Sequence, residues 1–442
     1  MLTPGSTLLL AAALGLGLSW ALFRGYASRE SHRRLAVALV AASLLLPQFL
    51  LALGVVSPRS ATGVGLIVLS AGVAEAALMS GRGREPYPVW PRRAWAALWF
   101  AVLTIQFLAM LKGTWPYLPQ LSLFAGLSVM WWVRIDSELV ERGIQPVWII
   151  FGGAMLALLP FGILDGANSD GVTESLDEAS PYWNSALSVL GLDARWSGMF
   201  AHPNALGAFA ALGVGFALSR SRFSWPLLLL STPLLLASSS RTAGIAVFAG
   251  AIAYVVIKGR IRLRLGILVA AALVGVITYQ SLSRDQNAAT GTGRFEVWEL
   301  VPGLLGPDWL WGLGPEAGPA LVHSGLLPSW AARLHSVVFE HLLYSGVLGL
   351  ACVLLLLLAL IAAAFYNRDG LPLLLVVGTL ALGDNYANLF QLTLGVLGYV
   401  AVLATCTPAS GRAVAREQGG LRGNSKRLEA EILIPARGGP AR

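Results

Sequence analysis

A histidine and two arginines stand where polar segments of this chain meet long apolar runs. His335 precedes an apolar run that begins near residue 336, Arg241 lies in ASSSRTAG between two apolar runs, and Arg294 is in GTGRFEVWEL. Histidine titrates near neutral pH and can take a proton from a hydroxyl group. Arginine binds phosphate through planar, charge-assisted hydrogen bonds. A base beside phosphate-binding groups at a membrane surface predicts transfer of a group from a phosphate-linked lipid to a hydroxyl acceptor.

Each arginine also has a purely structural interpretation. Arg241 can extend to the membrane interface, although the three serines before it and the start of the next helix favour an anion site. Arg294 shares one face of a predicted helix with Val297, Trp298 and Val301. That helix can lie flat on the bilayer, as its tryptophan suggests, and still direct Arg294 into a site.

The remaining histidines and cysteines argue against a metal centre. His335 and His341 are six residues apart, so they face nearly opposite sides of a helix and do not form a zinc pair. Cys352 and Cys406 lack metal-ligand spacing and are too few for a disulfide framework. No Ser-His-Asp order or carboxylate pair indicates a hydrolase. We therefore expect neither a metal nor a cofactor.

The composition predicts lipid as the solvent for most of the chain. Of 442 residues, 56% are hydrophobic and only 12% are charged, about half the charge of an average soluble domain. We expect an all-α fold, a polytopic transmembrane helix bundle with about 12–13 spans, because helices satisfy their own backbone groups in lipid. The first apolar block is expected to be a retained helix rather than a signal peptide. The predicted spans are 6–23, 35–55, 61–80, 94–111, 120–134, 147–164, 199–218, 225–237, 242–257, 265–282, 336–365, 371–383 and 389–405.

The basic residues predict how the chain is oriented. More than half of the 31 Lys and Arg residues fall in RGYASRESHRR, GRGREPYPVWPRR, RIDSELVERG, SRSR, KGRIRLR and NRDG, which marks these loops as cytoplasmic. The net charge of +8 then faces lipid headgroups and requires no nucleic acid. Two long loops fall on the outer side, where function is often found.

The predicted organisation follows from these assignments. It comprises N-terminal transmembrane helices (1–164), an acidic outer loop (165–198), transmembrane helices with the HPN and SSSR motifs (199–282), a large and partly helical outer (periplasmic) loop (283–335), C-terminal transmembrane helices (336–406) and a basic, flexible cytoplasmic tail (407–442).

Three blocks of sequence, in this order, carry a resemblance to a known family. They are RWSGMFAHPNALG (195–207), with Arg-x-x-Gly and then Pro-Asn-x-x-Gly; SSSRTAG (238–244), with Ser-x-Ser-Arg; and GRFEVW (293–298) followed by GLG (312–314) and His335 with Gly346 and Gly349. Together they resemble the O-antigen ligase and O-antigen polymerase family of bacterial integral-membrane glycosyltransferases, which act in lipopolysaccharide and cell-envelope polysaccharide biosynthesis.

The resemblance implies a metal-independent, inverting transfer of a glycan from undecaprenyl diphosphate. The reaction would take place at the periplasmic or outer face of the inner membrane, among membrane lipids. Arg241 and Arg294 would hold the diphosphate, and His335 would act as the base on the hydroxyl of a glycan or lipid acceptor. Arg195 would join the donor site, although it can equally pair with the acidic loop 165–198.

Three further residues are candidates for substrate binding. Asn204 and His202 belong to HPN, which can equally be a structural start of a helix, since proline is well tolerated in the first helical turn. Ser336 stands where family members often have asparagine, and its hydroxyl would orient the base or a sugar more weakly.

The motifs leave more than one activity open. A ligase would join a finished glycan to a lipid or protein, whereas a polymerase would join lipid-linked repeat units, and both need the same donor site and base. Inverted repeats and charges at the membrane midplane would favour a transporter or flippase. We see no repeat, and Glu75 and Asp384 are interpreted as isolated charges. If the chain were a sensor or scaffold, the arginines on the outer side would be dispensable. The ligase is the preferred prediction.

Overall fold

The chain folds into helices in every part that the structure describes. The computed structural model describes residues 29–78, 89–113, 118–159, 196–200, 202–219, 224–258, 294–328, 331, 334–383, 389–390 and 392–407, and these contain no β-strand. The predicted all-α fold is therefore confirmed. The elements are α2 (Arg29–Ala52), α3 (Pro58–Leu78), α4 (Val89–Leu111), α5 (Leu118–Trp132), α6 (Ser137–Leu139), the π-helix η1 (Val140–Ile144), α7 (Gln145–Leu158), α8 (Pro203–Leu218), α9 (Trp225–Ser238), α10 (Arg241–Lys258), α12 (Arg294–Leu305), the 3-10 helix η6 (Gly306–Asp308), α13 (Ala317–His323), α14 (Val337–Tyr366), the 3-10 helix η8 (Arg368–Gly370), α15 (Leu371–Gly383) and α16 (Leu394–Thr405).

The helices overlap the predicted spans wherever those spans fall on described residues. The predicted spans 6–23 and 265–282 lie outside the described residues. Within the described residues, four helices are long and apolar enough to cross a membrane, and these are Glu30–Ala52, Ser60–Ala77, Val89–Leu111 and Val337–Tyr366. Shorter apolar helices include those at 203–218, 225–238, 241–257 and 394–405. The chain is a helical membrane protein, and its full number of spans stays a prediction.

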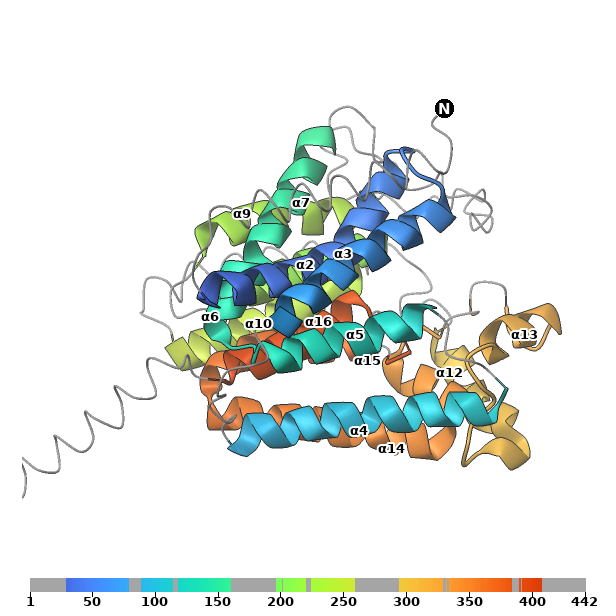
Figure 1. Cartoon of the computed structure of the whole chain (residues 1–442). Helices are drawn as coiled ribbons and strands as arrows, with labels where there is room; N and C mark the ends of the chain where they lie inside the picture. The colour runs from blue at the N-terminus through green and yellow to red at the C-terminus, as the bar shows by residue number, and fades with distance from the viewer. Residues whose placement is uncertain are drawn as a thin grey trace, which may run out of the picture.

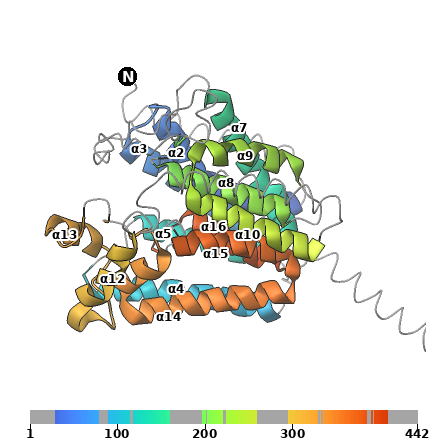
Figure 2. The ribbon, with the colours of Figure 1, turned by 180° about the vertical axis from the view of Figure 1, so that it is seen from behind.

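Long and short helices occupy different parts of the bundle. The long helices α4 and α14 lie side by side along one edge, and the short helices α12 and α13 lie at one end of this pair (Figures 1 and 2). The helices α10, α15 and α16 lie between that edge and the pair formed by α2 and α3 (Figure 1). The end of the α4–α14 pair that carries α12 is where Arg294 and His335 lie.

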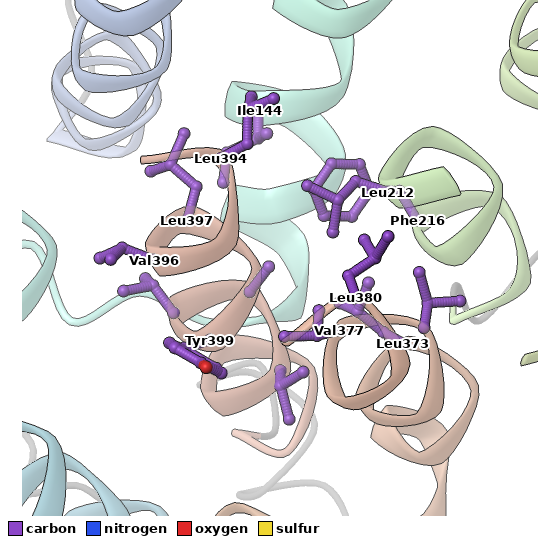
Figure 3. Packing of buried hydrophobic residues seen from close by; sticks show 14 of the residues in the cluster. Ile144, Leu212, Phe216, Leu373, Val377, Leu380, Leu394, Val396, Leu397 and Tyr399 are labelled. Carbon is purple, nitrogen blue, oxygen red and sulfur yellow. The ribbon is translucent and has the colours of Figure 1, made fainter. Parts of the chain in front are cut away.

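The core of the bundle depends on small residues that let helices approach closely. Apolar side chains of α8 and α15 point toward one another beside α16 (Figure 3), among them Leu212, Leu373 and Leu380. A Cβ atom at Gly398 would lie 2.8 Å from Cγ2 of Val377. Helix interfaces in membranes gain their stability from such close packing, because lipid offers little hydrophobic contrast.

Polar contacts join loops that the sequence assigns to the same side of the membrane. Arg33, in RESHRR, lies 3.3 Å from a carboxylate oxygen of Asp136 in RIDSELVERG, measured from Nη2 to Oδ2. Ser219, which begins SRSR, accepts the backbone N–H of Leu373, just after NRDG, at 3.1 Å. These contacts agree with the prediction that the basic loops lie on the same side of the membrane.

The interpretation of Glu75 as an isolated charge is wrong. Its carboxylate is buried, and Oε2 lies 2.9 Å from Nδ1 of His32. The helices α2 and α3 are neighbours that run in opposite directions, so the start of one meets the end of the other. The sequence alone does not show which helices pair, and so it could not show this partner. Asp384 lies outside the described residues.

Candidate functional site

The HPN motif is the start of α8. His202 occupies the N-cap position with an extended backbone (φ −145°, ψ 140°), and Pro203 is the first helical residue. Nδ1 of His202 accepts the backbone N–H of Asn204 at 3.1 Å, which satisfies one of the donors that the first helical turn leaves open. The proline costs nothing there, because its position needs no N–H donor. The structure thus gives His202 a capping role and leaves Asn204 buried in the first turn.

The first two sequence blocks are in direct contact. The backbone N–H of Trp196 donates to the carbonyl of Ala237 at 3.0 Å. On α8, a Cβ atom at Gly207 would lie 2.5 Å from Cβ of Ser240. Glycine at this position therefore allows α8 to lie against the turn that carries Arg241. Arg195 itself lies outside the described residues.

The serines of SSSR form the turn between α9 and α10. Ser239 adopts the left-handed conformation (φ 47°, ψ 32°) and ends α9. Ser240 precedes α10, and its hydroxyl accepts the backbone N–H of Ala243 at 3.4 Å. Arg241 is consequently the first residue of α10 and is half-buried. The N-terminus of a helix carries a positive potential that adds to the charge of this arginine.

The carbonyl oxygen of Gly383 brings the two predicted phosphate-binding segments together. Nη1 of Arg294 donates to this oxygen at 2.9 Å, and the hydroxyl of Thr242 donates to it at 3.3 Å. Gly383 ends α15, so its carbonyl is one of those that the helix leaves without an internal donor. Because Thr242 follows Arg241, the start of α10 and the start of α12 meet at the end of α15.

Helix α12 connects this group to His335. Its first residue, Arg294, lies at Gly383, and one turn later the indole Nε1 of Trp298 donates to the carbonyl of Leu334 at 2.7 Å. The ring of Trp298 also stacks on Phe339 of α14, with a centroid distance of 4.9 Å. Val297 and Val301 are buried, as the predicted helical face requires. A single turn of helix therefore places Arg294 and the residue before His335 at fixed positions.

His335 stands in an unusual backbone conformation immediately before α14. Its φ angle is 50°, a value that few residues other than glycine adopt and that is found at functional sites when the surroundings impose it. Ser336 follows as the N-cap of α14 and is almost fully buried, but its side chain makes no capping hydrogen bond. The turn thus sets the direction of the imidazole before the apolar helix begins.

The glycines of GLG and Gly346 meet at a kink in α14. Gly346 has non-helical angles (φ 65°, ψ −165°), and a Cβ atom at Gly312 would lie 2.4 Å from its backbone nitrogen. The kink exposes backbone groups that must be satisfied in an apolar setting, and the GLG loop provides the partners. Four hydrogen bonds link the two segments: Leu313 N to Leu343 O (2.8 Å), Gly314 N to Tyr344 O (3.0 Å), Val347 N to Trp309 O (2.9 Å) and Leu348 N to Leu310 O (3.3 Å).

Two buried residues of this region have contacts that the sequence did not indicate: His341 was considered only as a zinc ligand, and Gln106 was not considered. His341 is fully buried in α14, and its Nε2 accepts the backbone N–H of Leu389 at 3.3 Å. Gln106, buried in α4, donates Nε2 to the carbonyls of Leu389 at 3.2 Å and Phe390 at 3.3 Å. A polar side chain inside an apolar helix is the signal that could have identified both.

The second and third sequence blocks both lie within a segment that matches a known family. Residues 226–354 match the family model described as O-antigen ligase. This segment begins in α9 and ends within α14, and it contains Arg241, Arg294 and His335. No curated protein matches the chain. Together with its apolar helices, the match shows that this membrane protein contains a segment similar to the O-antigen ligase family.

Proposed function

We propose that this chain is a membrane glycosyltransferase that transfers a glycan from undecaprenyl diphosphate to a hydroxyl acceptor. The observation that carries the proposal is the geometry of α12. Arg294 lies on the carbonyl of Gly383 beside Thr242 and Arg241, and Trp298 of the same helix is bonded to the residue before His335. A predicted phosphate-binding group and a predicted base are thereby held by one short rigid element.

The arginines suit a diphosphate that becomes more negative during the reaction. A guanidinium has five N–H donors in a fixed plane, so a hydrogen bond from one nitrogen to a carbonyl is compatible with a second, bidentate partner. As the bond between the sugar and the diphosphate breaks, negative charge grows on the leaving oxygen. Positive groups fixed at that point stabilise the transition state more than the bound substrate.

His335 would activate the acceptor. Its imidazole takes the proton from the acceptor hydroxyl, and the oxygen attacks the anomeric carbon of the donor sugar. The bond from that carbon to the diphosphate breaks, and the diphosphate leaves with the electron pair. A single displacement of this kind inverts the configuration at the anomeric carbon, and the proton on His335 is then released to water. No step in this scheme requires a metal ion.

We place the reaction at the outer face of the bacterial inner membrane. The supporting observation is that the loops richest in Lys and Arg belong to the opposite side according to the positive-inside rule. The donor is then an isoprenoid lipid within the bilayer, with its headgroup at the level of Arg241 and Arg294.

A reconstituted assay tests the proposal. The purified full-length chain in nanodiscs is given an undecaprenyl-diphosphate-linked oligosaccharide and a lipid acceptor, with and without chelator. We expect product in both conditions. Arg241→Lys and Arg294→Lys should reduce the rate by about 10²-fold, because lysine keeps the positive charge but lacks the planar set of N–H donors that binds phosphate in a bidentate way.

Arg142→Lys is the matched control, because Arg142 is largely exposed and pairs with Glu138 on another part of the bundle. Its rate should equal that of the parent. A ladder of products would indicate a polymerase instead of a ligase. Equal rates for all three lysine variants would contradict the proposed donor site.

A further inference from the structure

The connection between α15 and α16 is the feature that the proposed mechanism does not use. α15 ends at Gly383 after 13 residues, and α16 starts at Leu394 and has 12 residues. At 1.5 Å per residue, each helix is about 20 Å long, whereas the hydrocarbon core is about 30 Å thick. Non-helical backbone near such helix ends must be satisfied by protein groups rather than by lipid.

His341 and Gln106 supply these groups at residues 389 and 390. His341 accepts the N–H of Leu389, and Gln106 donates to the carbonyls of Leu389 and Phe390. The ring of Phe390 stacks on His341 with a centroid distance of 4.9 Å and meets Tyr344 edge-on at 5.6 Å. Two long helices, α4 and α14, therefore both bind the same short piece of backbone. We call these two side chains the 389–390 clamp.

Packing alone does not account for a histidine in the clamp. Because Nε2 accepts a hydrogen bond, the ring is neutral and carries its hydrogen on Nδ1. Nδ1 is buried, and among the described residues no hydrogen-bond partner lies within reach of it. A phenylalanine would stack on Phe390 without burying an N–H group such as Nδ1–H. A phenylalanine also has no acceptor for the N–H of Leu389, and this indicates that the histidine is there for its hydrogen bond to Leu389.

The same bond excludes His341 as the proposed base. A general base needs a free lone pair directed at the acceptor hydroxyl. The lone pair of Nε2 is occupied by a backbone N–H, and the ring is fully buried. His341 therefore acts on the structure around the site and not on the substrate.

Two points of the connection contact elements that carry proposed site residues. At its start, Gly383 receives hydrogen bonds from Arg294 and Thr242. Farther along, the clamp ties residues 389 and 390 to α14, the helix that begins after His335. A shift of these residues would move the donor group relative to the base.

We propose that His341 and Gln106 are positioning residues of the transferase site: by fixing residues 389 and 390 between α4 and α14, they set the distance between the donor-binding arginines and His335. This inference rests on the proposed function. Misplacement of reacting groups by about 1 Å can cost about 10²-fold in rate, so loss of the clamp should lower the turnover number without removing any group that touches substrate.

The test combines amide exchange with kinetics on the full-length chain in nanodiscs. Hydrogen–deuterium exchange is followed in the peptide that contains Leu389, and transfer is measured with an undecaprenyl-diphosphate-linked oligosaccharide as donor. His341→Phe and Gln106→Leu should speed exchange at Leu389 and Phe390 and lower kcat by roughly 10²-fold, while the KM for the donor stays near that of the parent. His341→Gln, whose amide oxygen can accept the N–H, should recover most of the lost rate.

Gln145→Leu is the matched control for Gln106→Leu, because Gln145 is also buried but lies at the start of α7. It should leave both the exchange at Leu389 and kcat unchanged. Unchanged exchange in His341→Phe, or faster exchange with an unchanged kcat, overturns the inference. If the parent chain forms no product, the proposed function is contradicted, and the proposed role of the clamp in transfer is contradicted with it. The exchange data would then test only whether His341 and Gln106 fix residues 389 and 390.

Discussion

At the scale of single residues, the histidines of the chain stand in different local settings. His202 and His341 each accept a backbone N–H, and His32 pairs with Glu75. His335 differs from these three, because it lies in a strained turn between two segments of the candidate site. The chemistry of histidine was visible in the sequence, but the partner of each imidazole depends on which helices pack together.

The capping role of His202 gives a prediction for stability. His202→Ala should lower the free energy of unfolding by about 1 kcal/mol, because the N–H of Asn204 loses its acceptor. His202→Asn should retain most of the stability, since asparagine is a good N-cap residue. Thermal unfolding in detergent measures both. A large loss of transfer in His202→Ala without any loss of stability would mean that the histidine contacts substrate.

At the scale of elements, hydropathy predicted where helices lie but not how they are interrupted. The predicted span 336–365 agrees with α14 to within a residue at each end. The kink at Gly346 was not predicted, because it depends on the approach of the GLG loop from about 30 residues earlier in the chain. The glycines were recognised through a family resemblance, and the structure gives their physical reason. Likewise, the fixed relation of Arg294 to His335 comes from the hydrogen bond of Trp298 to Leu334.

The close approach of GLG to the kink gives a second prediction. Gly312→Ala should be strongly destabilising, because its φ is 76° and the added Cβ would lie 2.4 Å from the backbone nitrogen of Gly346. The measured quantities are the yield of folded protein and its melting temperature. Gly303→Ala is the matched control: a Cβ at Gly303 meets nothing within 4 Å, and alanine is favoured over glycine in a helix. If Gly312→Ala melts at the temperature of the parent, the described packing of loop and kink is wrong.

At the scale of the whole molecule, the two ends of the bundle have different environments. One end holds the contacts between basic loops, such as that of Arg33 with Asp136, and the other holds α12 and α13 (Figure 1). The distribution of Lys and Arg predicts which end faces the cytoplasm. The sequence could not show how the two ends are connected, because that depends on which of many similar apolar helices pack against one another.

Thiol labelling tests this orientation. Glu316, beside α13, is exposed, and Arg142 on the opposite side of the predicted membrane is also accessible. In spheroplasts, an impermeant maleimide should label Glu316→Cys directly and Arg142→Cys only after permeabilisation. The native Cys352 and Cys406 are buried and should give little background in the parent chain. The reverse pattern would place the candidate site on the cytoplasmic side.

We propose that His335 activates the acceptor beside a diphosphate held by Arg241 and Arg294. A single-turnover measurement of glycan transfer by the parent and His335→Gln tests this proposal, with binding of undecaprenyl diphosphate measured on the same samples. We expect His335→Gln to bind the lipid as the parent does and to transfer glycan about 10²- to 10⁴-fold more slowly, as expected for loss of a general base. Transfer at the parental rate by His335→Gln would contradict the account.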